Sequence, residues 1–452
     1  MRLLRVLGSS LACLLLFVPL ESDGRGNIQS EQAREALEIL RRMSEAPGMA
    51  AAIARNGEVL WHHEAGLADI EGAVEVSPET VFRLASVSKA VTAVVTAKAL
   101  QDGHLELKDT ASEWLEIDHD ASLEQLLSHT GSVDHYNPII PVDLDRPYPS
   151  SVSALPTVRP HLMNATPGRQ YVYSTFGYTL AAAMVETASG ATYPQLLASL
   201  AEVAETPSLR APVEESAVSS LTRFYQVGTR GVNPARPRNF SYAFAGAGVV
   251  SNAVDLARFL SLFASGQLVE AKWRDTMLQP ARFDDGTIVQ DQRYEVALGW
   301  RRQSGPLGQT WFHHAGVTDG ARTVAAIEPA SGVAVVILSN ASWTGDLFGT
   351  AATLANLYLQ PLQAIQPATP RRVLFEGEDH ELGTMRCLSV TCIYSGPGTG
   401  GLPDWLSGGG RKGRFEIRTT PTARYVASPY GLALFNGDTA HIGSRSITLQ
   451  TH

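Results

Sequence analysis

The stretch that most constrains the fold of this chain runs from Phe82 to Leu100, FRLASVSKAVTAVVTAKAL. Its apolar, helix-forming run begins with Ser86 and Lys89, and residues three apart share one face of a helix. The dipole at a helix N-terminus favours an alkoxide over a neutral hydroxyl. Apolar neighbours favour a neutral lysine, because desolvation lowers a lysine pKa. The stretch therefore predicts a helix that presents a serine nucleophile beside a base.

The Ser-x-x-Lys spacing is weak evidence when it stands alone, because it also arises by chance. The choice of lysine strengthens it, because the chain otherwise uses arginine at most basic positions. The remaining lysines are Lys98, Lys108, Lys272 and Lys412. An arginine at position 89 could not act as a base, since arginine does not deprotonate in proteins. A buried helix with an incidental serine stays open at this point.

Length and charge narrow the class of protein. A chain of 452 residues suits one large domain with a small addition, or two domains. The net charge of −9 gives no sign of a nucleic-acid partner. No motif implies a metal ion or an organic cofactor. We therefore expect a globular protein that acts on a small-molecule or peptide substrate.

The N-terminus has the pattern of a targeting segment. Arg2 and Arg5 precede an apolar run from Val6 to Leu20, which is too short for a comfortable membrane span. We interpret residues 1–24 as a signal peptide and expect an exported protein, periplasmic or extracellular. An uncleaved anchor is the alternative, and membrane association is expected only through this segment.

Cysteine usage agrees with export. If Cys13 leaves with the signal peptide, Cys387 and Cys392 remain as an even pair, five residues apart. A disulfide that closes this short loop suits an oxidising compartment. The alternative is two unpaired buried thiols.

Hydrophobic periodicity predicts strands near both ends of the main domain and helices between them. Asn56-Gly57 between two apolar runs is a strong hairpin signal. The expected elements are helices 31–44, 176–188, 256–264 and 347–359, and strands 49–54, 58–64, 295–301, 310–315, 323–328 and 333–339. The predicted fold class is α+β: an antiparallel sheet flanked by helices, with an all-helical lobe inserted at about 105–252. This domain is expected to span 30–362.

A different texture follows the proline-containing linker 361–370. Short strand patterns separated by glycines and turns fill the rest of the chain. We predict a small β-rich C-terminal domain over 371–452, with no candidate catalytic residue.

Three motifs resemble those of the serine β-lactamase and D-Ala-D-Ala peptidase superfamily. Ser86-Val87-Ser88-Lys89 matches the first, YSTFGYTL from Tyr173 the second, and His314-Ala315-Gly316 the third, with histidine in place of lysine. The chain is most similar to the branch related to class C enzymes and esterases, mitochondrial serine-β-lactamase-like peptidases included. The resemblance covers about Gln32 to Leu362 and implies the β-lactamase/transpeptidase-like fold.

The resemblance also implies a role for each residue. Ser86 would attack a carbonyl to form an acyl-enzyme, with Lys89 and Tyr173 as general base and proton shuttle. The backbone N–H groups of Ser86 and Val317 would form the oxyanion hole. Gly316 would let its strand approach the substrate closely.

Other positions depart from the pattern of the superfamily. Thr175 stands where many relatives have asparagine, which weakens the grip on a substrate amide. His314 carries positive charge less reliably than lysine, because its pKa lies near neutrality. Ala315 lacks a hydroxyl often found there. Thr175, His314, Ala315, Gly316 and Val317 are therefore candidate substrate-binding residues, with β-lactams and carboxylates as less favoured substrates.

Three functions follow, in order of preference. The first is a secreted or envelope serine hydrolase that works through an acyl-enzyme on Ser86, as a peptidase and next as an esterase. The second is a β-lactamase or D-Ala-D-Ala carboxypeptidase, and the third is a catalytically silent binding or scaffold protein. A metal site at His313-His314 is not expected, because adjacent strand residues point to opposite faces. A homo-oligomer is left open, because the relative implied by the resemblance assembles into filaments.

Overall fold

The computed structural model describes most of the chain up to residue 359, and a set of strands beyond it. The described residues are 24–136, 146–228, 231–305, 307–342, 346–359, 372–375, 378–381, 385–388, 391–394, 416–419, 424–428, 431–442 and 445–450. The predicted signal peptide, apart from Gly24, and the linker 361–370 lie outside these residues.

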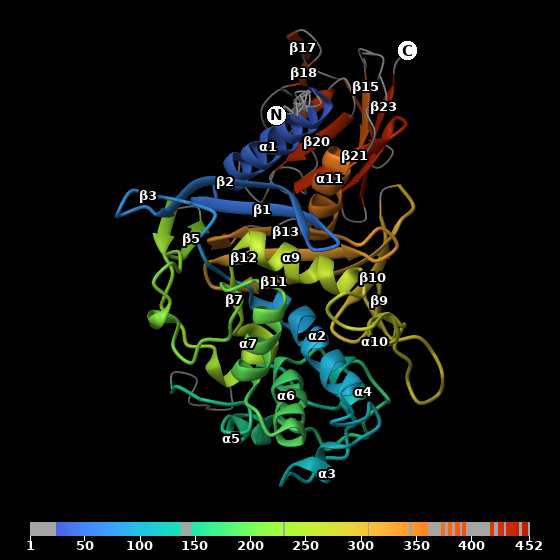
Figure 1. The fold of residues 1–452 in the computed structure, drawn as a ribbon. Coiled ribbons are helices and arrows are strands. Elements are labelled where there is room, and N and C mark those ends of the chain that lie inside the picture. The colour runs from blue at the N-terminus through green and yellow to red at the C-terminus, as the bar shows by residue number, and fades with distance from the viewer. Residues whose placement is uncertain are drawn as a thin grey trace, which may run out of the picture.

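A nine-stranded antiparallel sheet joins the two ends of the main domain (Figure 1). Its strands in spatial order are β3 (Val74–Glu75), β2 (Glu58–Asp69), β1 (Gly48–Arg55), β13 (Val333–Ser339), β12 (Ala321–Glu328), β11 (Thr310–Thr318), β10 (Arg301–Ser304), β9 (Tyr294–Val296) and β8 (Gln290–Asp291). The hairpin of β1 and β2 turns at Asn56 and Gly57, which have φ of 52° and 86°. Both values suit a tight hairpin turn, and the predicted hairpin is confirmed.

Helices cover both faces of this sheet. Alternate residues of β1 point to opposite faces: Met49, Ala51 and Ile53 join one apolar core, and Ala50, Ala52 and Ala54 join the other. The first core lies under α1 (Gly24–Ser44) and α11 (Leu347–Leu359), and the second under α9 (Ala253–Ala264) (Figure 1). The predicted sheet flanked by helices is therefore confirmed.

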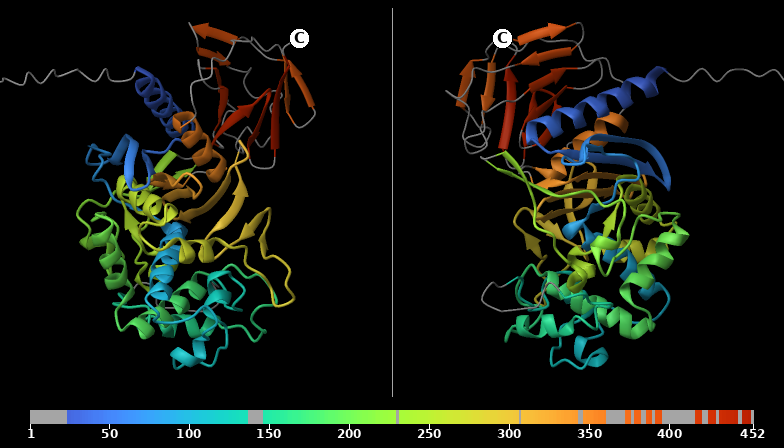
Figure 2. Two further views of the ribbon diagram at one scale, coloured as in Figure 1. Left: turned by 45° about the vertical axis from the view of Figure 1, so that its right-hand side comes forward. Right: turned by 90° about the vertical axis from the view of Figure 1, so that its left-hand side faces the viewer.

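A helical region lies in sequence between the N-terminal and the C-terminal strands of this sheet. In space it lies on the face of the sheet that α9 covers (Figures 1 and 2). It contains α2 (Ser88–Gln101), α3 (Ala111–Trp114), α4 (Leu123–Leu127), α5 (Leu155–Val158), α6 (Thr175–Ser189), α7 (Tyr193–Val203) and α8 (Phe244–Ala247). Ser174 caps α6 by accepting a hydrogen bond from the Gly177 N–H, and Gly190 ends it with a φ of 73°. These caps explain why this helix was predicted well from sequence.

Two sequence predictions about local structure are wrong. The α-helix does not begin at Ser86, which lies in a 3₁₀ turn, Ala85–Val87, before α2 begins at Ser88. The predicted strand 295–301 is two strands, β9 and β10, because Gly299 adopts a φ of 86° and turns the chain. The turn buries Trp300, whose ring stacks on Phe263 at 6.2 Å.

A hairpin inside the helical region was also missed. It consists of β5 (Tyr225–Gly228) and β6 (Gly231–Pro234), and β5 pairs with β14 (Ala341–Ser342). These strands are too short to show a clear alternation in sequence.

A second nine-stranded antiparallel sheet forms the small C-terminal domain (Figure 2). Its strands in spatial order are β16 (Glu378–Glu381), β15 (Arg372–Phe375), β23 (Arg445–Gln450), β22 (Thr439–Ile442), β21 (Gly431–Asn436), β20 (Arg424–Ser428), β19 (Glu416–Thr419), β18 (Thr391–Tyr394) and β17 (Met385–Leu388). The domain rests on α11, where the Thr350 and Thr353 hydroxyls accept the N–H groups of Leu432 and Leu434.

The cysteine pair lies in this C-terminal sheet. Cys387 and Cys392 are opposite each other in the register of β17 and β18. Their side chains lie outside what the structure describes, so the disulfide stays a prediction.

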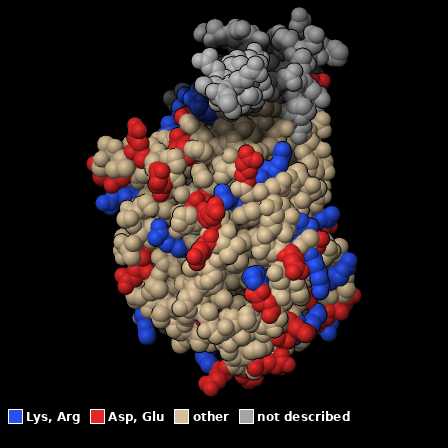
Figure 3. Space-filling view, viewed as in Figure 1, with Lys and Arg blue, Asp and Glu red and all other residues tan. Residues whose placement is uncertain are grey.

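Of the helices within the described ranges, none combines the length and the apolar character needed to cross a bilayer. Acidic and basic side chains are interspersed over the face shown in Figure 3.

Gly316 on β11 lies against the turn that carries Ser86. A methyl group at Gly316 would lie 2.2 Å from the Leu84 carbonyl oxygen and 2.2 Å from the Thr323 hydroxyl. We expect Gly316→Ala to lower the free energy of unfolding by about 1–3 kcal/mol, as measured by urea denaturation. Gly228→Ala is the matched control, because Gly228 also lies in a strand and nothing approaches its added methyl group. Equal stability of the two variants would contradict this contact.

Candidate active site

The turn that carries Ser86 is fixed on two sides. Leu84 donates its N–H to the Val249 carbonyl and accepts a hydrogen bond of 2.7 Å from the Thr323 hydroxyl of β12. Ala85 adopts a φ of 49°, which is unusual for a residue with a side chain and is typical of functional turns. Ser86 itself is partly exposed. The turn therefore holds a reachable hydroxyl against β11.

Lys89 lies one turn below Ser86 and is completely buried. Its Nζ donates to the Ser86 Oγ at 3.3 Å, the Thr175 Oγ1 at 3.2 Å and the Gly246 carbonyl at 2.8 Å. Burial lowers the pKa of Lys89, and the Tyr173 phenol opposes this shift. A buried amine with a lowered pKa, in contact with a hydroxyl, can accept that hydroxyl's proton.

Tyr173 completes the cluster with Ser86 and Lys89. Its ring centroid lies 4.8 Å from Lys89 Nζ, and the interactions of its phenol with Lys89 and Ser86 favour the ionised form. Burial favours the neutral phenol, but the charges of Lys89 and Arg301 outweigh it, so the pKa of Tyr173 is lowered. The three residues predicted from distant motifs therefore meet at one point, with two groups able to take a proton from the third.

Arg301 is a residue that sequence reasoning missed. It begins β10, and its guanidinium lies 5.5 Å from the Tyr173 ring centroid and donates to His314 Nε2 at 3.2 Å. Asp291 of β8 forms an ion pair with it at 2.5 Å. Arg301 directly follows the Ala297-Leu298-Gly299-Trp300 stretch, but only the fold shows that this position faces Tyr173.

His314 does not carry the positive charge of the site. Burial and the nearby charges of Arg301 and Lys89 hold its pKa well below the usual value. Its Nδ1 contacts the Ala315 carbonyl at 2.8 Å and its Nε2 faces Arg301. These contacts fit a neutral ring with the proton on Nδ1. The cation at this position is therefore Arg301, and His314 connects it to the strand.

Two further histidines fix the second motif. His129 Nδ1 accepts the Ser174 N–H at 3.1 Å, and His135 Nδ1 accepts the Thr175 N–H at 3.2 Å. Both act as acceptors and are therefore neutral. Burial lowers the pKa of His135 to about 4. The His129 ring also lies 4.4 Å from the Tyr173 ring between centroids. These rings position Tyr173 and Thr175 from behind.

Hydroxyl groups occupy the space beside Thr175. Its Oγ1 accepts from Lys89, and nearby the Tyr136 phenol accepts from the Tyr242 phenol at 3.2 Å. This arrangement offers donors and acceptors without the amide that asparagine would provide.

The third motif borders an open strand edge. Strand β10 pairs with residues 310–313 of β11 only, so Ala315 to Val317 have no described strand partner on that side. Gly316 touches the Ser86 turn, and the Val317 side chain is 52% exposed. An extended substrate can therefore add to this edge within reach of Ser86.

The histidine pair on β11 points to two different surroundings. His313 stacks on Phe348 of α11 at 4.3 Å, whereas His314 faces Tyr173. The part of the chain that the structure describes contains no cluster of three His, Cys, Asp or Glu residues suited to a metal ion.

Comparison with known proteins agrees with this fold. The sequence profile of the family described as Beta-lactamase matches residues 36–360. The human "Serine beta-lactamase-like protein LACTB, mitochondrial" is 24% identical over 382 residues, which covers 64% of this chain and 70% of that protein. The octameric penicillin-binding protein homologue from Pyrococcus abyssi superposes with a TM-score of 0.61 at 16% identity, over 92% of this chain and 99% of that one. A class C beta-lactamase gives a TM-score of 0.61 at 18% identity, over 76% and 99%.

The lowered pKa of Lys89 predicts a pH-dependent stability. Between the folded pKa and the unfolded value of about 10.4, the unfolded chain binds more protons than the folded chain. Stability must therefore rise with pH, by at most about 1.4 kcal/mol per pH unit for one proton. We expect wild type to gain stability relative to Lys89→Met in urea denaturation from pH 7 to 9. Lys98→Met, on the same helix but partly exposed, should follow wild type. A difference that stays constant or falls with pH would refute the desolvation of Lys89.

Arg301 should tune the proton acceptors. Its charge lowers the pKa of both Lys89 and Tyr173, so Arg301→Met should raise both. The rate at which a fluorophosphonate labels Ser86 should then reach its midpoint at a higher pH. Labelling at neutral pH should become roughly tenfold slower for each pH unit by which that midpoint rises. Arg302→Met is the control, because Arg302 pairs with Glu295. An unchanged midpoint would show that the guanidinium does not act on the pair.

Proposed function

The chain belongs to the beta-lactamase family and is a serine hydrolase, and from this membership we propose that it cleaves peptides, and next esters, through an acyl-enzyme on Ser86. The observation that carries the proposal is the contact of a buried lysine and a tyrosine of lowered pKa with one reachable hydroxyl. A hydroxyl becomes a nucleophile when an adjacent base takes its proton.

The proposed reaction has two steps. The Lys89–Tyr173 pair takes the proton of Ser86 as its Oγ bonds to the substrate carbonyl carbon, and returns it to the leaving amine or alkoxide as that bond breaks. Water then attacks the acyl-enzyme with the same pair as base. This releases the acid and restores the Ser86 hydroxyl.

Backbone groups would stabilise the oxyanion in each step. The proposed donors are the N–H groups of Ser86 and Val317, which lie on the turn and strand held together through Gly316. Each such donor is typically worth about 10²–10³ in rate. Because close packing fixes the two segments relative to each other, they need little reorganisation during the reaction.

The surroundings favour a peptide over a β-lactam or a D-Ala-D-Ala terminus. The open edge of β11 suits an extended main chain. The Arg301 guanidinium is already engaged by Asp291 and His314, so it is less available for a substrate carboxylate. Thr175 and Ala315 also lack the amide and the hydroxyl that are often found at these positions in the superfamily. A β-lactamase or carboxypeptidase is therefore the second candidate.

A catalytically silent scaffold is less well supported. Burying Lys89 costs free energy unless its donors are satisfied, and here they are satisfied by the groups that the chemistry needs. The open strand edge and partly exposed Ser86 also serve no evident purpose in a closed scaffold.

Location and assembly are proposed on separate grounds. We propose export because of the N-terminal pattern and the cysteine pair. Self-association is suggested by the octameric Pyrococcus abyssi protein, whose match includes most of this chain.

Substitution of the nucleophile tests the proposal directly. Ser86→Ala should abolish labelling by a fluorophosphonate and lower kcat for a chromogenic peptide and for p-nitrophenyl acetate by at least about 10³-fold. The fold should be unaffected, because Ser86 is partly exposed. Ser112→Ala, at an exposed serine, is the control. Persistent labelling would remove Ser86 as the nucleophile, and faster turnover of a chromogenic cephalosporin than of peptides would favour the second candidate.

A further inference from the structure

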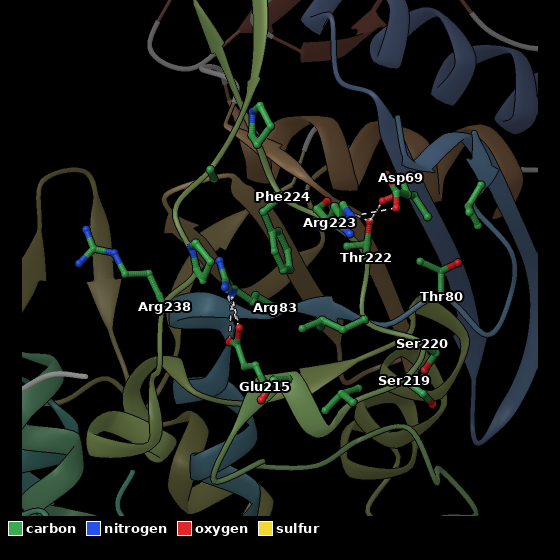
Figure 4. A pocket seen from close by; sticks show the side chains of 18 of the residues that line it. Asp69, Thr80, Arg83, Glu215, Ser219, Ser220, Thr222, Arg223, Phe224 and Arg238 are labelled. Atoms are coloured by element: carbon green, nitrogen blue, oxygen red, sulfur yellow. Dashed lines mark hydrogen bonds and ion pairs between the residues drawn. The ribbon is translucent and has the colours of Figure 1, made fainter. Parts of the chain in front are cut away.

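A cavity of about 1070 Å³ lies near the end of β11, and Ser86 is not among the residues that line it (Figure 4). Two loops, 68–80 and 214–224, and the segment 234–239 form most of its wall. The volume is at the upper end of that typical for ligand sites. The cavity is therefore large enough to accommodate several residues of an extended peptide.

The floor of the cavity is a buried ion pair. Arg83 and Glu215 are 3% and 8% exposed, and the Arg83 Nε and Nη2 lie 2.7 Å from the same carboxylate oxygen (Figure 4). The guanidinium also lies 4.0 Å from the Phe224 ring centroid and 5.4 Å from that of Phe240. A pair held in this way provides a rigid, polar floor, because its donors and acceptors are already fixed.

The two sides of the cavity differ in their remaining charges, because Arg223 and Asp69 on the Thr80 side neutralise each other in an ion pair of 2.8 Å. Arg236 and Arg238 lie on the 234–239 segment, whereas Glu75 and Glu79 lie on the loop near Thr80. Figure 4 places Arg238 and Thr80 on opposite sides of the Arg83–Glu215 pair. Among the described residues, Arg236, Glu75 and Glu79 have no ion-pair partner. The cavity therefore favours a ligand with a negative group at one end and a positive group at the other.

The acidic wall also offers a free strand edge. Strand β3 ends the main sheet and pairs only with β2 among the described strands. Both its residues line the cavity, and Val74 is 52% exposed. An extended peptide can use such an edge for main-chain hydrogen bonds, while side-chain charges fix its direction.

These features disfavour other ligand classes. The hydroxyls of Ser77, Thr80, Ser219 and Ser220 and the charges of both signs on the walls disfavour a wholly apolar ligand. The Phe224 ring is covered by Arg83, so it provides no open platform for a sugar. Carboxylates on one wall would repel a polyanion.

Asp319, which follows β11, contacts two residues that line the cavity. Arg83 Nη1 lies 3.5 Å from the Asp319 carbonyl, and Arg238 pairs with the Asp319 carboxylate at 3.0 Å. Asp319 is two residues beyond Val317 of the open edge. A peptide that leaves this edge past Thr318 thus meets the basic wall of the cavity first.

We propose that this cavity is a second binding site, which takes an extended peptide segment that carries charges of both signs and lies beyond the scissile bond. The proposal rests on the proposed peptidase function, because the segment is part of the substrate. An acidic side chain lies against Arg236 and a basic side chain lies near Glu79.

Charge exchange across the cavity tests this site. The probe is a fluorescent 12-residue peptide with an acidic and a basic half, and its binding to Ser86→Ala protein is followed by anisotropy. Adding Arg236→Glu should weaken binding about tenfold. Adding both Arg236→Glu and Glu79→Arg should restore binding for the peptide with its halves exchanged. Neither Arg236 nor Glu79 contacts the catalytic cluster. Enzyme that retains Ser86 and carries these substitutions should therefore turn over p-nitrophenyl acetate at the wild-type rate.

The outcomes separate this site from the proposed function. Charge-dependent binding without any peptide cleavage supports the site and refutes the peptidase. Peptide cleavage with the same KM in wild type and in both charge variants overturns the site and supports the peptidase. Loss of a dimer in sedimentation on Arg236→Glu, with no peptide binding, would assign the cavity to a second copy of the chain and also overturn the proposal.

Discussion

The arrangement around the catalytic turn depends on keeping one amine, that of Lys89, out of water. Desolvation of a lysine is costly unless its donors are satisfied. Here Ser86, Thr175 and Gly246 satisfy them from three separate segments. The cost therefore becomes a constraint on the fold, because a shift of any one segment leaves the buried amine with an unmade hydrogen bond. This links the stability of the helical region to the geometry of the nucleophile.

The two halves of the site come from different parts of the architecture. The proposed base lies on α2, which is packed in the core, and the proposed nucleophile lies on the turn just before it. The strand of the proposed oxyanion hole belongs to the sheet. Gly316 lets the two meet at backbone distance, and Thr323 joins β12 to Leu84. Close backbone contacts allow little relative motion of the two segments, because neither can yield by rotating a side chain. Packing therefore preorganises the turn and the strand.

Sequence predicted the parts of this molecule that depend on local signals. The hairpin followed from Asn56-Gly57, the α6 helix from its apolar helical pattern, and Ser86, Lys89 and Tyr173 from motifs with fixed spacing. Arg301 could not be found in this way, because its approach to Tyr173 depends on the register of β10 and β11 after the turn at Gly299. The partners of His129 and His135 also needed the fold, since both accept backbone N–H groups, which carry no sequence signature.

Electrostatics connect these elements to the choice of substrate. His314 is neutral, and Arg301 is neutralised at close range by Asp291, so a ground-state substrate meets little net charge. The field of Arg301 instead lowers the pKa of Tyr173, which eases the exchange of a proton between the phenol and its neighbours. Interactions that strengthen in the transition state raise kcat, whereas a cation free to bind a carboxylate would strengthen the ground state as well. An uncharged main chain is therefore the substrate that this balance favours, and specificity for it has to come from contacts away from the scissile bond.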